Sequence, residues 1–281
     1  MIRESTRVPT VGNRHGPGPD EELAGIACSP PDEGDPPAVT RTLRYVVALT
    51  ALIVLGPLSP ADASAERVIG ASDTGAPIEA YLVGNPEATN RIVVLGQMHG
   101  DEPAGRRVVS VLRGLTPPPD TAMWLIPTMN PDGHARGTRT NARGVDLNRN
   151  FPTQWNEQGA GTRQWSGPRA ASEPETQAVM EFLREVQPTA MLSFHQPFGV
   201  VDITHPPARK AGRLLARWMD LPARPVGCSG PCPGTLTEWV TEELNAIALT
   251  VELPATVPSS AVDRSASAVI RLARWLSQQS A

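Results

Sequence analysis

The chain has 281 residues, 40% of them hydrophobic and 19% charged, and its formal net charge is −4. This composition provides for a buried core and excludes a globally disordered chain. No run of basic residues is longer than two, so the sequence predicts no nucleic-acid partner. With 24 glycines and 30 prolines, the fold is expected to be rich in loops.

Residues 41–65 have the pattern of a signal peptide. Two arginines precede an apolar stretch, Tyr45–Leu55, which is followed by small residues of the A-x-A type. The stretch is shorter than the roughly 20 residues that span a bilayer, so a retained membrane anchor is the less favoured alternative. We expect cleavage after Ala63 or Ala65, a periplasmic or secreted protein, and no stable membrane span in the mature form.

Residues 1–40, ahead of this segment, are polar, rich in proline and glycine, and contain the isolated Cys28. They are predicted to be a disordered extension or a stretch that is not translated, with synthesis starting near Val39. The chain is thus divided into this extension, the signal peptide and one folded domain over residues 66–281.

In the folded domain, apolar runs alternate with amphipathic stretches. The runs expected as strands are Ile78–Val83, Arg91–Gly96, Ala122–Pro127, Ala190–Phe194, Val200–Ile203 and Ala246–Glu252. The stretches expected as helices are Glu102–Leu112, Pro174–Glu185, Ala208–Met219, Thr235–Leu244 and Ala261–Leu276, the second of them opened by a capping box from Ser172 to Glu175. The alternation predicts an α/β fold with a single-domain, mixed, mostly parallel twisted sheet and helices on both of its faces.

Three of the expected strands end at, or just before, residues of the types that bind metals. His99 and Glu102 follow the second expected strand, His195 follows the fourth, and Glu252 ends the sixth. Because functional side chains of such sheets gather beyond the carboxyl ends of the strands, we expect these four to lie together. Two imidazoles and one carboxylate form a catalytic zinc ligand set, which leaves Glu252 as a candidate base. A single buried histidine is more often a core residue, but three such strand ends favour a metal site.

Met129–Pro152 is a polar segment without helix or strand periodicity, and we expect it to be a functional loop. Within it, Asn148 and Arg149 place an amide beside a guanidinium, which suits a carboxylate ligand. Arg139 offers a second cation for an oxyanion. By contrast, His134 and His205 fall in expected loops and are predicted to be solvent-exposed rather than metal ligands.

Cys228 and Cys232 lie close together in the segment GCSGPCPG. In an exported protein, such a pair favours a disulfide that constrains a short loop. The alternative is a pair of metal thiolates, which is less favoured because no histidine follows within reach.

Five motifs occur along the chain: GQMHGDEPAG, NPDG, TRTNARGVDLNRNFP, SEPET and TVELP. Together they resemble the zinc carboxypeptidase family, and in particular its branch of short bacterial murein peptide amidases, over about residues 75–255. The resemblance implies a zinc carboxypeptidase-like domain that binds one Zn²⁺ through His99, Glu102 and His195. It also implies a metallopeptidase that hydrolyses an amide bond with zinc-activated water and a glutamate base.

The resemblance assigns roles to the remaining residues of the expected site. Glu252 matches the general base, and Arg139 matches the arginine that polarises the scissile carbonyl. Asn148 and Arg149 match the clamp that binds the substrate carboxylate. Asp146 matches the acid that orients the first zinc histidine, which fixes its tautomer and raises its basicity.

The chain departs from digestive carboxypeptidases in the loop that covers the substrate. Those enzymes carry a mobile tyrosine before the last strand, whereas the only tyrosine after residue 65 here is Tyr81. Thr237 and Glu238 fall where the family lines its side-chain pocket, and their polarity suits the amphoteric side chain of meso-diaminopimelate. The expected partner is therefore a peptidoglycan stem peptide, cut between γ-D-glutamate and meso-diaminopimelate.

Two other functions remain open at this point. An N-acyl amino acid deacylase of the aspartoacylase or succinylglutamate desuccinylase type shares the His-x-x-Glu plan with a distant histidine. The export signal and the NPDG and SEPET motifs argue against it. A non-catalytic peptidoglycan-binding relative is the second alternative, but it does not require all three ligands and the base to be intact.

Overall fold

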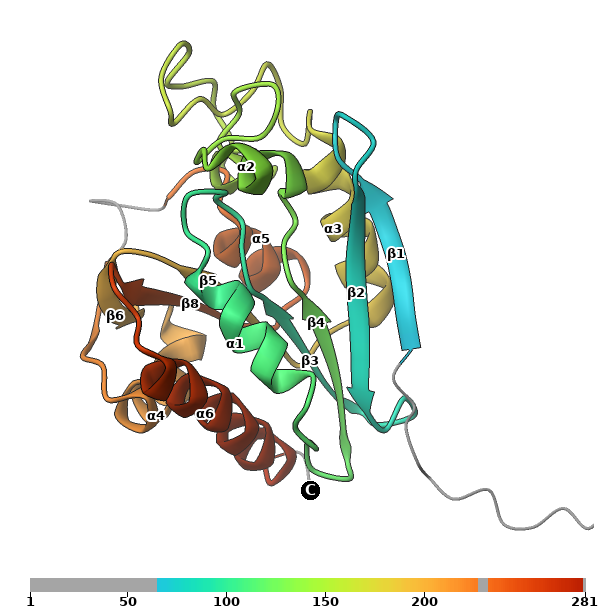
Figure 1. Ribbon diagram of the computed structural model, residues 1–281, viewed down its shortest axis with the longest axis vertical. Coiled ribbons are helices and arrows are strands. Elements are labelled where there is room, and N and C mark those ends of the chain that lie inside the picture. Colours follow the sequence, from blue (N-terminus) through green and yellow to red (C-terminus); the bar gives the residue numbers. More distant parts are fainter. Residues whose placement is uncertain (1–64, 227–231, 280–281) are drawn as a thin grey trace, which may run out of the picture. The chain divides into compact units, whose positions relative to one another are not determined.

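The computed structural model describes residues 65–226 and 232–279, so Cys228 and nearly all of the expected signal peptide lie outside the described residues. The described residues form one eight-stranded sheet with the strand order β1-β2-β4-β3-β5-β8-β6-β7 (Figure 1). The strands are β1 (Ala65–Ala71), β2 (Pro77–Gly84), β3 (Asn90–Leu95), β4 (Thr121–Ile126), β5 (Ala190–His195), β6 (Phe198–Asp202), β7 (Ala223–Arg224) and β8 (Ile247–Pro254).

The centre of this sheet is parallel. β4, β3, β5 and β8 are parallel neighbours, whereas β2 joins β4, and β6 joins β8, in antiparallel pairs. The parallel pairing brings the carboxyl ends of β3, β5 and β8 to one edge of the sheet. The fold is therefore the expected mixed, mostly parallel α/β arrangement.

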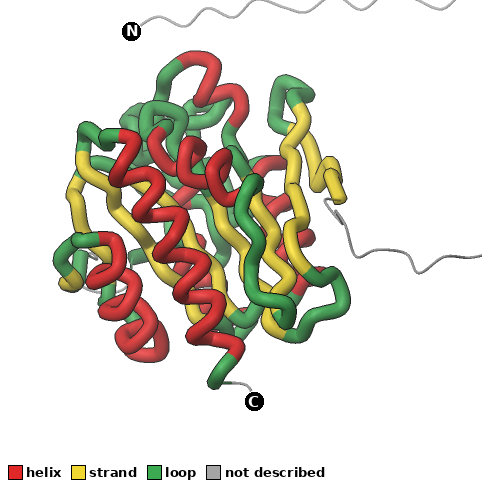
Figure 2. The backbone as a smooth tube through the Cα atoms, turned by 60° about the horizontal axis from the view of Figure 1, so that its bottom comes forward, coloured by secondary structure: helices red, strands yellow, loops and turns green. Residues whose placement is uncertain are grey.

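Helices cover both faces of the sheet (Figure 2). They are α1 (Ala104–Leu112), α2 (Pro131–Arg136), α3 (Pro174–Val186), α4 (Arg209–Met219), α5 (Leu236–Glu243) and α6 (Ser259–Ser277), with two short 3₁₀ helices, η1 (Leu147–Arg149) and η2 (Pro206–Ala208). Apolar side chains of α1, α4 and α6 form one core on one face, and those of α3 and α5 form a second core on the other.

Strand β3 shows why its sequence is a continuous apolar run. Ile92 and Val94 enter the core that contains α1, while Val93 and Leu95 enter the core that contains α3. All four side chains have 0% exposure, and burying each contributes about 1.5–3 kcal/mol to folding. A strand between two helical layers therefore needs apolar residues at every position, and it anchors the loop that follows it.

Each strand and helix expected from the sequence is present, with ends within two residues of the expected ones. The segment Met129–Pro152 differs from expectation, because it contains α2 and η1. In α2, the side chain of Asn130 accepts a hydrogen bond from the backbone of Gly133, and the helix stops at Gly137, whose φ is 63°. This helix is too short for its periodicity to be visible in the sequence.

The strands β1 and β7 were not expected either. β1 carries mostly exposed residues and β7 has only two residues, so neither shows an apolar pattern. Across the described residues, the structure contains no helix whose length and apolar character are sufficient to cross a bilayer.

Candidate active site

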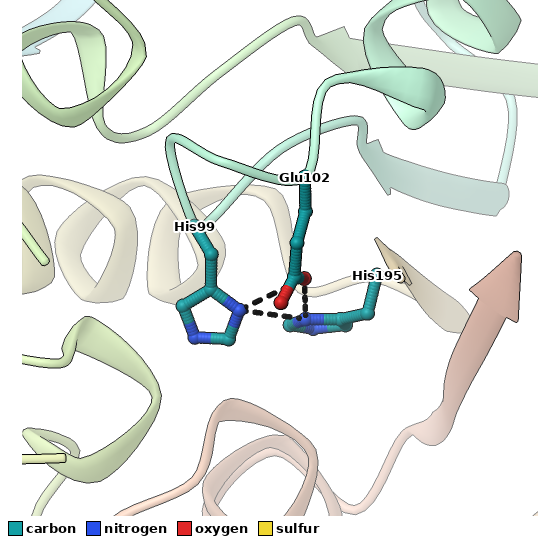
Figure 3. A group of neighbouring side chains, drawn as sticks. All are labelled: His99, Glu102 and His195. Atoms are coloured by element: carbon teal, nitrogen blue, oxygen red, sulfur yellow. Dashed lines mark hydrogen bonds and ion pairs between the residues drawn. The ribbon is translucent and has the colours of Figure 1, made fainter. Parts of the chain in front are cut away.

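His99, Glu102 and His195 converge at the carboxyl edge of the sheet (Figure 3). Nδ1 of His99 lies 2.9 Å from Oε2 of Glu102, and Nδ1 of His195 lies 3.2 Å from each of these two atoms. Atoms held about 2.0–2.1 Å from a tetrahedral zinc ion are roughly 3.3 Å apart. The three side chains are buried and have the spacing of a zinc ligand set.

Each imidazole is oriented by a hydrogen-bond partner at its Nε2 atom, on the side of the ring away from the other ligands. Nε2 of His99 lies 3.0 Å from Oδ1 of the buried Asp146, and Nε2 of His195 lies 2.9 Å from the hydroxyl of Ser193. When the two Nε2 atoms carry the protons, both Nδ1 atoms direct their lone pairs at the point between the three side chains where a metal ion fits. The donor set and its orientation therefore fit a zinc ion, and Asp146 lies where the resemblance placed it.

The two carboxylates of the cluster favour a bound cation. Burial opposes the charge of Glu102, but its close contacts with His195 and His99 outweigh burial and lower the pKa of this carboxyl. Burial is outweighed in the same way at Asp146, where interactions with His99 and Arg139 lower the pKa. Both groups are therefore ionised at neutral pH, and buried charges of one sign require cationic partners.

Glu252 lies beside His195, because β5 and β8 run in parallel register and pair these two residues. Its Oε2 atom is buried and has no hydrogen-bond partner among the described residues. Burial, together with the charge of Glu102, raises the pKa of Glu252. An unpaired carboxylate oxygen with raised basicity at the metal cluster has the properties that a general base needs.

Arg139 reaches the cluster from the loop between α2 and η1. Its Nε donates to Oδ2 of Asp146 at 2.9 Å, and its Nη1 donates to Oε1 of Glu102 at 3.1 Å. Nη1 also lies 3.2 Å from Nδ1 of His99, whereas none of the hydrogen bonds with described residues involves the two N–H donors on Nη2. Those two donors are free for a substrate oxygen.

Asn148 and Arg149 lie in η1, which is fixed against the start of α5. The side-chain oxygen of Asn148 accepts a hydrogen bond of 3.0 Å from the backbone of Leu236. Gly234 has a φ of 71°, and a Cβ there would lie 2.1 Å from the carbonyl oxygen of Arg149, so only glycine fits. Burial lowers the pKa of Arg149, and the charge of Asp146 opposes this shift without cancelling it.

A buried polar network holds the loop against the start of α3. Nδ2 of Asn141 donates to Glu173 at 2.8 Å and to Glu175 at 3.1 Å. Nδ2 of Asn150 donates to the hydroxyl of Ser172 at 2.9 Å. The expected capping box is wrong, because Glu173 is the N-cap of α3 and Ser172 donates its hydroxyl to Glu173. The SEPE residues therefore bind the loop rather than the end of the helix.

One cavity of about 430 Å³ joins the residues singled out from the sequence. Its walls include the metal-binding cluster, the base candidate, the loop residues and the first turn of α5, that is, His99, Glu102, His195, Glu252, Arg139, Asn148, Arg149, Thr237 and Glu238. Their convergence is the arrangement that hydrolysis of a peptide next to a carboxylate requires.

The cavity also contains residues that the sequence analysis missed, among them Asp202, Thr204 and His205. The prediction of a solvent-exposed His205 is wrong, because its side chain is 17% exposed and its Nδ1 lies 3.7 Å from Oε2 of Glu238. Asp202 ends β6, which is antiparallel to β8, so its carboxyl end lies away from the edge that carries the metal ligands and the strand-end rule did not identify it.

Cys232 lies at the same cavity and is disulfide-bonded. This bond agrees with the expectation of an oxidised cysteine rather than a metal thiolate. Its expected partner, Cys228, lies outside the described residues, so the pairing itself stays a prediction.

Residues 118–203 match the profile of the zinc carboxypeptidase family. Murein peptide amidase A of Escherichia coli (strain K12) is 32% identical over 220 residues, which cover 73% of this chain and 88% of that protein. The structure of murein-tripeptide amidase MpaA from Escherichia coli O157 matches with a TM-score of 0.61 and 28% identity, over 75% of this chain and 92% of that one. Carboxypeptidase A from Helicoverpa armigera matches in fold, with a TM-score of 0.64, 17% identity, and coverage of 76% and 68%.

The chain belongs to the zinc carboxypeptidase family. It is a zinc-dependent metallopeptidase, and His99, Glu102 and His195 are the group of described residues whose geometry suits the metal. Two relatives that match over most of their own length, from Escherichia coli and Vibrio campbellii, carry the name murein peptide amidase A.

Proposed function

We propose that the protein hydrolyses the amide bond between γ-D-glutamate and meso-diaminopimelate in peptidoglycan stem peptides. The observation that carries the proposal is the shared cavity, which is lined by a zinc ligand set, an unpaired carboxylate, three arginines and further acidic residues. The similarity to murein peptide amidase A over 73% of the chain supports this substrate class.

Zinc bound by His99, Glu102 and His195 supplies a Lewis acid that lowers the pKa of water and polarises a carbonyl group. In the proposed reaction, Glu252 takes a proton from the attacking water through its unpaired Oε2 and later gives it to the leaving amine. The raised pKa of Glu252 makes it a stronger base than an ordinary carboxylate, which favours uptake of the proton from water.

Arg139 stabilises the oxygen of the scissile carbonyl as negative charge develops on it. Its Nε and Nη1 are held by Asp146 and Glu102, so the guanidinium is fixed at the cavity before a substrate binds and loses little side-chain freedom during the reaction. The cation is therefore preorganised for an oxyanion.

Asn148 and Arg149 bind the carboxylate next to the scissile amide. The side-chain oxygen of Asn148 accepts a hydrogen bond from the backbone of Leu236 in α5. Its amide NH₂ therefore remains as a donor beside the guanidinium of Arg149. Thr237 and Glu238, in the first turn of α5, line the space for the side chain of the same residue.

We also propose that the enzyme is exported from the cytoplasm. The small residues at positions 61–65 support cleavage of a signal peptide after Ala63 or Ala65 and a periplasmic or secreted enzyme. N-terminal sequencing of the mature protein recovered from outside the cytoplasm tests this step, and a product that retains residues 41–65 overturns it.

The proposed reaction is tested by mass spectrometry of purified tripeptide muropeptides after digestion. We expect a single cut that releases meso-diaminopimelate, sensitivity to a zinc chelator, and no product with Glu252→Gln. Acetyl-aspartate and succinyl-glutamate serve as comparison substrates, and faster hydrolysis of either would favour a deacylase. Cleavage at another stem-peptide bond would contradict the assigned substrate.

A further inference from the structure

Asp202 lines the same cavity as the catalytic glutamate, Glu252. β6 and β8 form an antiparallel pair in which Val200 is opposite Glu252 and Val201 is opposite Val251. Continuing this register by one step places Asp202 opposite Thr250, on the face of the sheet that carries Glu252. Asp202, Thr250 and Glu252 all line the cavity, as this alternation requires.

One oxygen of the Asp202 carboxylate accepts hydrogen bonds within the protein, and the other accepts none from the described residues. Oδ1 accepts hydrogen bonds from the backbone and the hydroxyl of Thr204, at 2.9 and 2.6 Å, and from the backbone of Val226 at 3.1 Å. None of the described residues donates a hydrogen bond to Oδ2. The first oxygen therefore fixes the orientation of the group, and the second remains an acceptor for a ligand in the cavity.

The charged side chains that line the cavity outside the metal cluster come from different elements according to their sign. Arg139, Arg149 and Arg163 come from the segment between α2 and α3. Asp202 and Glu238 come from the end of β6 and from α5. A residue with a carboxylate at one position and an ammonium at another matches this division.

The two acidic side chains differ in how far they are already paired. Oε2 of Glu238 lies 3.7 Å from Nδ1 of His205, so its charge has a neighbouring partner. Asp202 has neutral donors only, and its negative charge is not matched by a cation among its hydrogen-bond partners. Of these two acidic side chains, Asp202 is thus the one that lacks a cationic partner among the described residues.

The spacing also agrees with the substrate. Two residue steps along a strand separate Asp202 from the register position of Glu252, which corresponds to about 7 Å. Glu252 protonates the amine of the leaving residue and therefore lies near its first stereocentre. In diaminopimelate, four carbon–carbon bonds separate this centre from the second one, a span of roughly 5 Å when extended. The distal ammonium, one bond further, reaches the end of β6.

From these contacts we infer that Asp202 determines substrate specificity by binding the distal ammonium group of the leaving residue through Oδ2. The inference rests on the proposed function and deepens it, because it names the group that distinguishes diaminopimelate from other acidic residues. Asp202 touches the substrate away from the reacting bond, so it affects the choice of substrate rather than the chemistry.

The experiment compares two peptides that differ only in this ammonium: γ-D-glutamyl-meso-diaminopimelate and γ-D-glutamyl-L-2-aminopimelate. The variant is Asp202→Asn, whose side-chain oxygen can still accept the three hydrogen bonds while an NH₂ replaces Oδ2. We expect kcat/KM for the diaminopimelate peptide to fall about 10- to 100-fold, mostly through KM, which is the effect of losing a hydrogen bond to a charged group. The same constant for the aminopimelate peptide should change less than about 3-fold, because this peptide presents no distal ammonium.

Asp263→Asn is the matched control, since Asp263 lies exposed on α6 and does not line the cavity. It should leave both constants unchanged. Equal losses on the two peptides would assign Asp202 a structural role only, and no loss on either would exclude it from binding; both outcomes overturn the inference. A wild-type enzyme that hydrolyses both peptides equally well overturns the inference alone. A wild-type enzyme that hydrolyses neither overturns the proposed function, and the inference with it.

Discussion

The metal-binding cluster and the loop over residues 129–152 face the same cavity, but they are held in different ways. The cluster stands at a sheet edge between two apolar cores, and its positions follow from strand pairing. The polar residues of the loop depend on hydrogen bonds to buried side chains, such as that from Asn141 to Glu173. Changes at the cluster should therefore reduce catalysis with little effect on folding, whereas changes in the network of the loop should impair substrate binding and stability together.

The largest expected effect is that of Glu252→Gln. Removing a general base lowers kcat by about 10² to 10⁴. The zinc content should stay at one ion per chain, because Glu252 is not in the proposed ligand set. Steady-state kinetics and elemental analysis of the same preparation check both statements. Activity above about a tenth of the wild type would show that another group takes the proton.

Asp146→Asn tests how the cluster is oriented. Asp146 binds Nε2 of His99 and Nε of Arg139, so its loss weakens the basicity of a ligand and releases the arginine. We expect zinc affinity to fall about 10- to 100-fold, measured by competition with a chelator. Asp120→Asn, an exposed change of the same type, should leave the affinity unaltered. An unchanged affinity in Asp146→Asn would mean that His99 is oriented without this carboxylate.

The same contrast explains what the sequence made predictable. The apolar run of β3 and the ligands His99, Glu102 and His195 were identifiable, because burial on both faces and strand-end placement are local features of the chain. The roles of Glu173 and Asp202 were not visible in this way. Glu173 binds Asn141, which is 32 residues away in the sequence. Asp202 is brought to the cavity by the antiparallel pairing of β6 with β8. Long-range contacts of polar residues leave no periodic pattern in the sequence.

Glu173→Gln addresses the network of the loop. Glu173 has 0% exposure and accepts hydrogen bonds from Asn141 and Ser172 on its two oxygens. A glutamine keeps only one of these acceptors and would face the other donor with its NH₂ group. We expect the free energy of unfolding to fall by about 1–3 kcal/mol. KM should rise several-fold while kcat changes less, because the loop carries the carboxylate clamp.

Denaturant unfolding and steady-state kinetics measure these two effects. Glu181→Gln is the matched control, because Glu181 is exposed on the same helix. It should change neither quantity. A fall in kcat at constant KM in Glu173→Gln would contradict the separation between the cluster and the loop.

The smallest expected effect is a pH dependence that belongs to the network of the loop. Burial, to which the charge of Glu173 adds, raises the pKa of Glu175 above its ordinary value of 4.5. The folded state therefore binds the proton more tightly than the unfolded state, so this group makes the protein less stable as pH rises through the window from 4.5 to its folded pKa. Glu175→Gln removes the titration. The stability of the wild type relative to this variant should increase as pH is lowered through that window and stay constant below it. Denaturant unfolding of both proteins at matched pH measures this difference and cancels the titrations that they share, including those of the metal cluster. A difference in stability that does not change with pH, or that decreases on acidification, would show that Glu175 does not titrate as its burial requires.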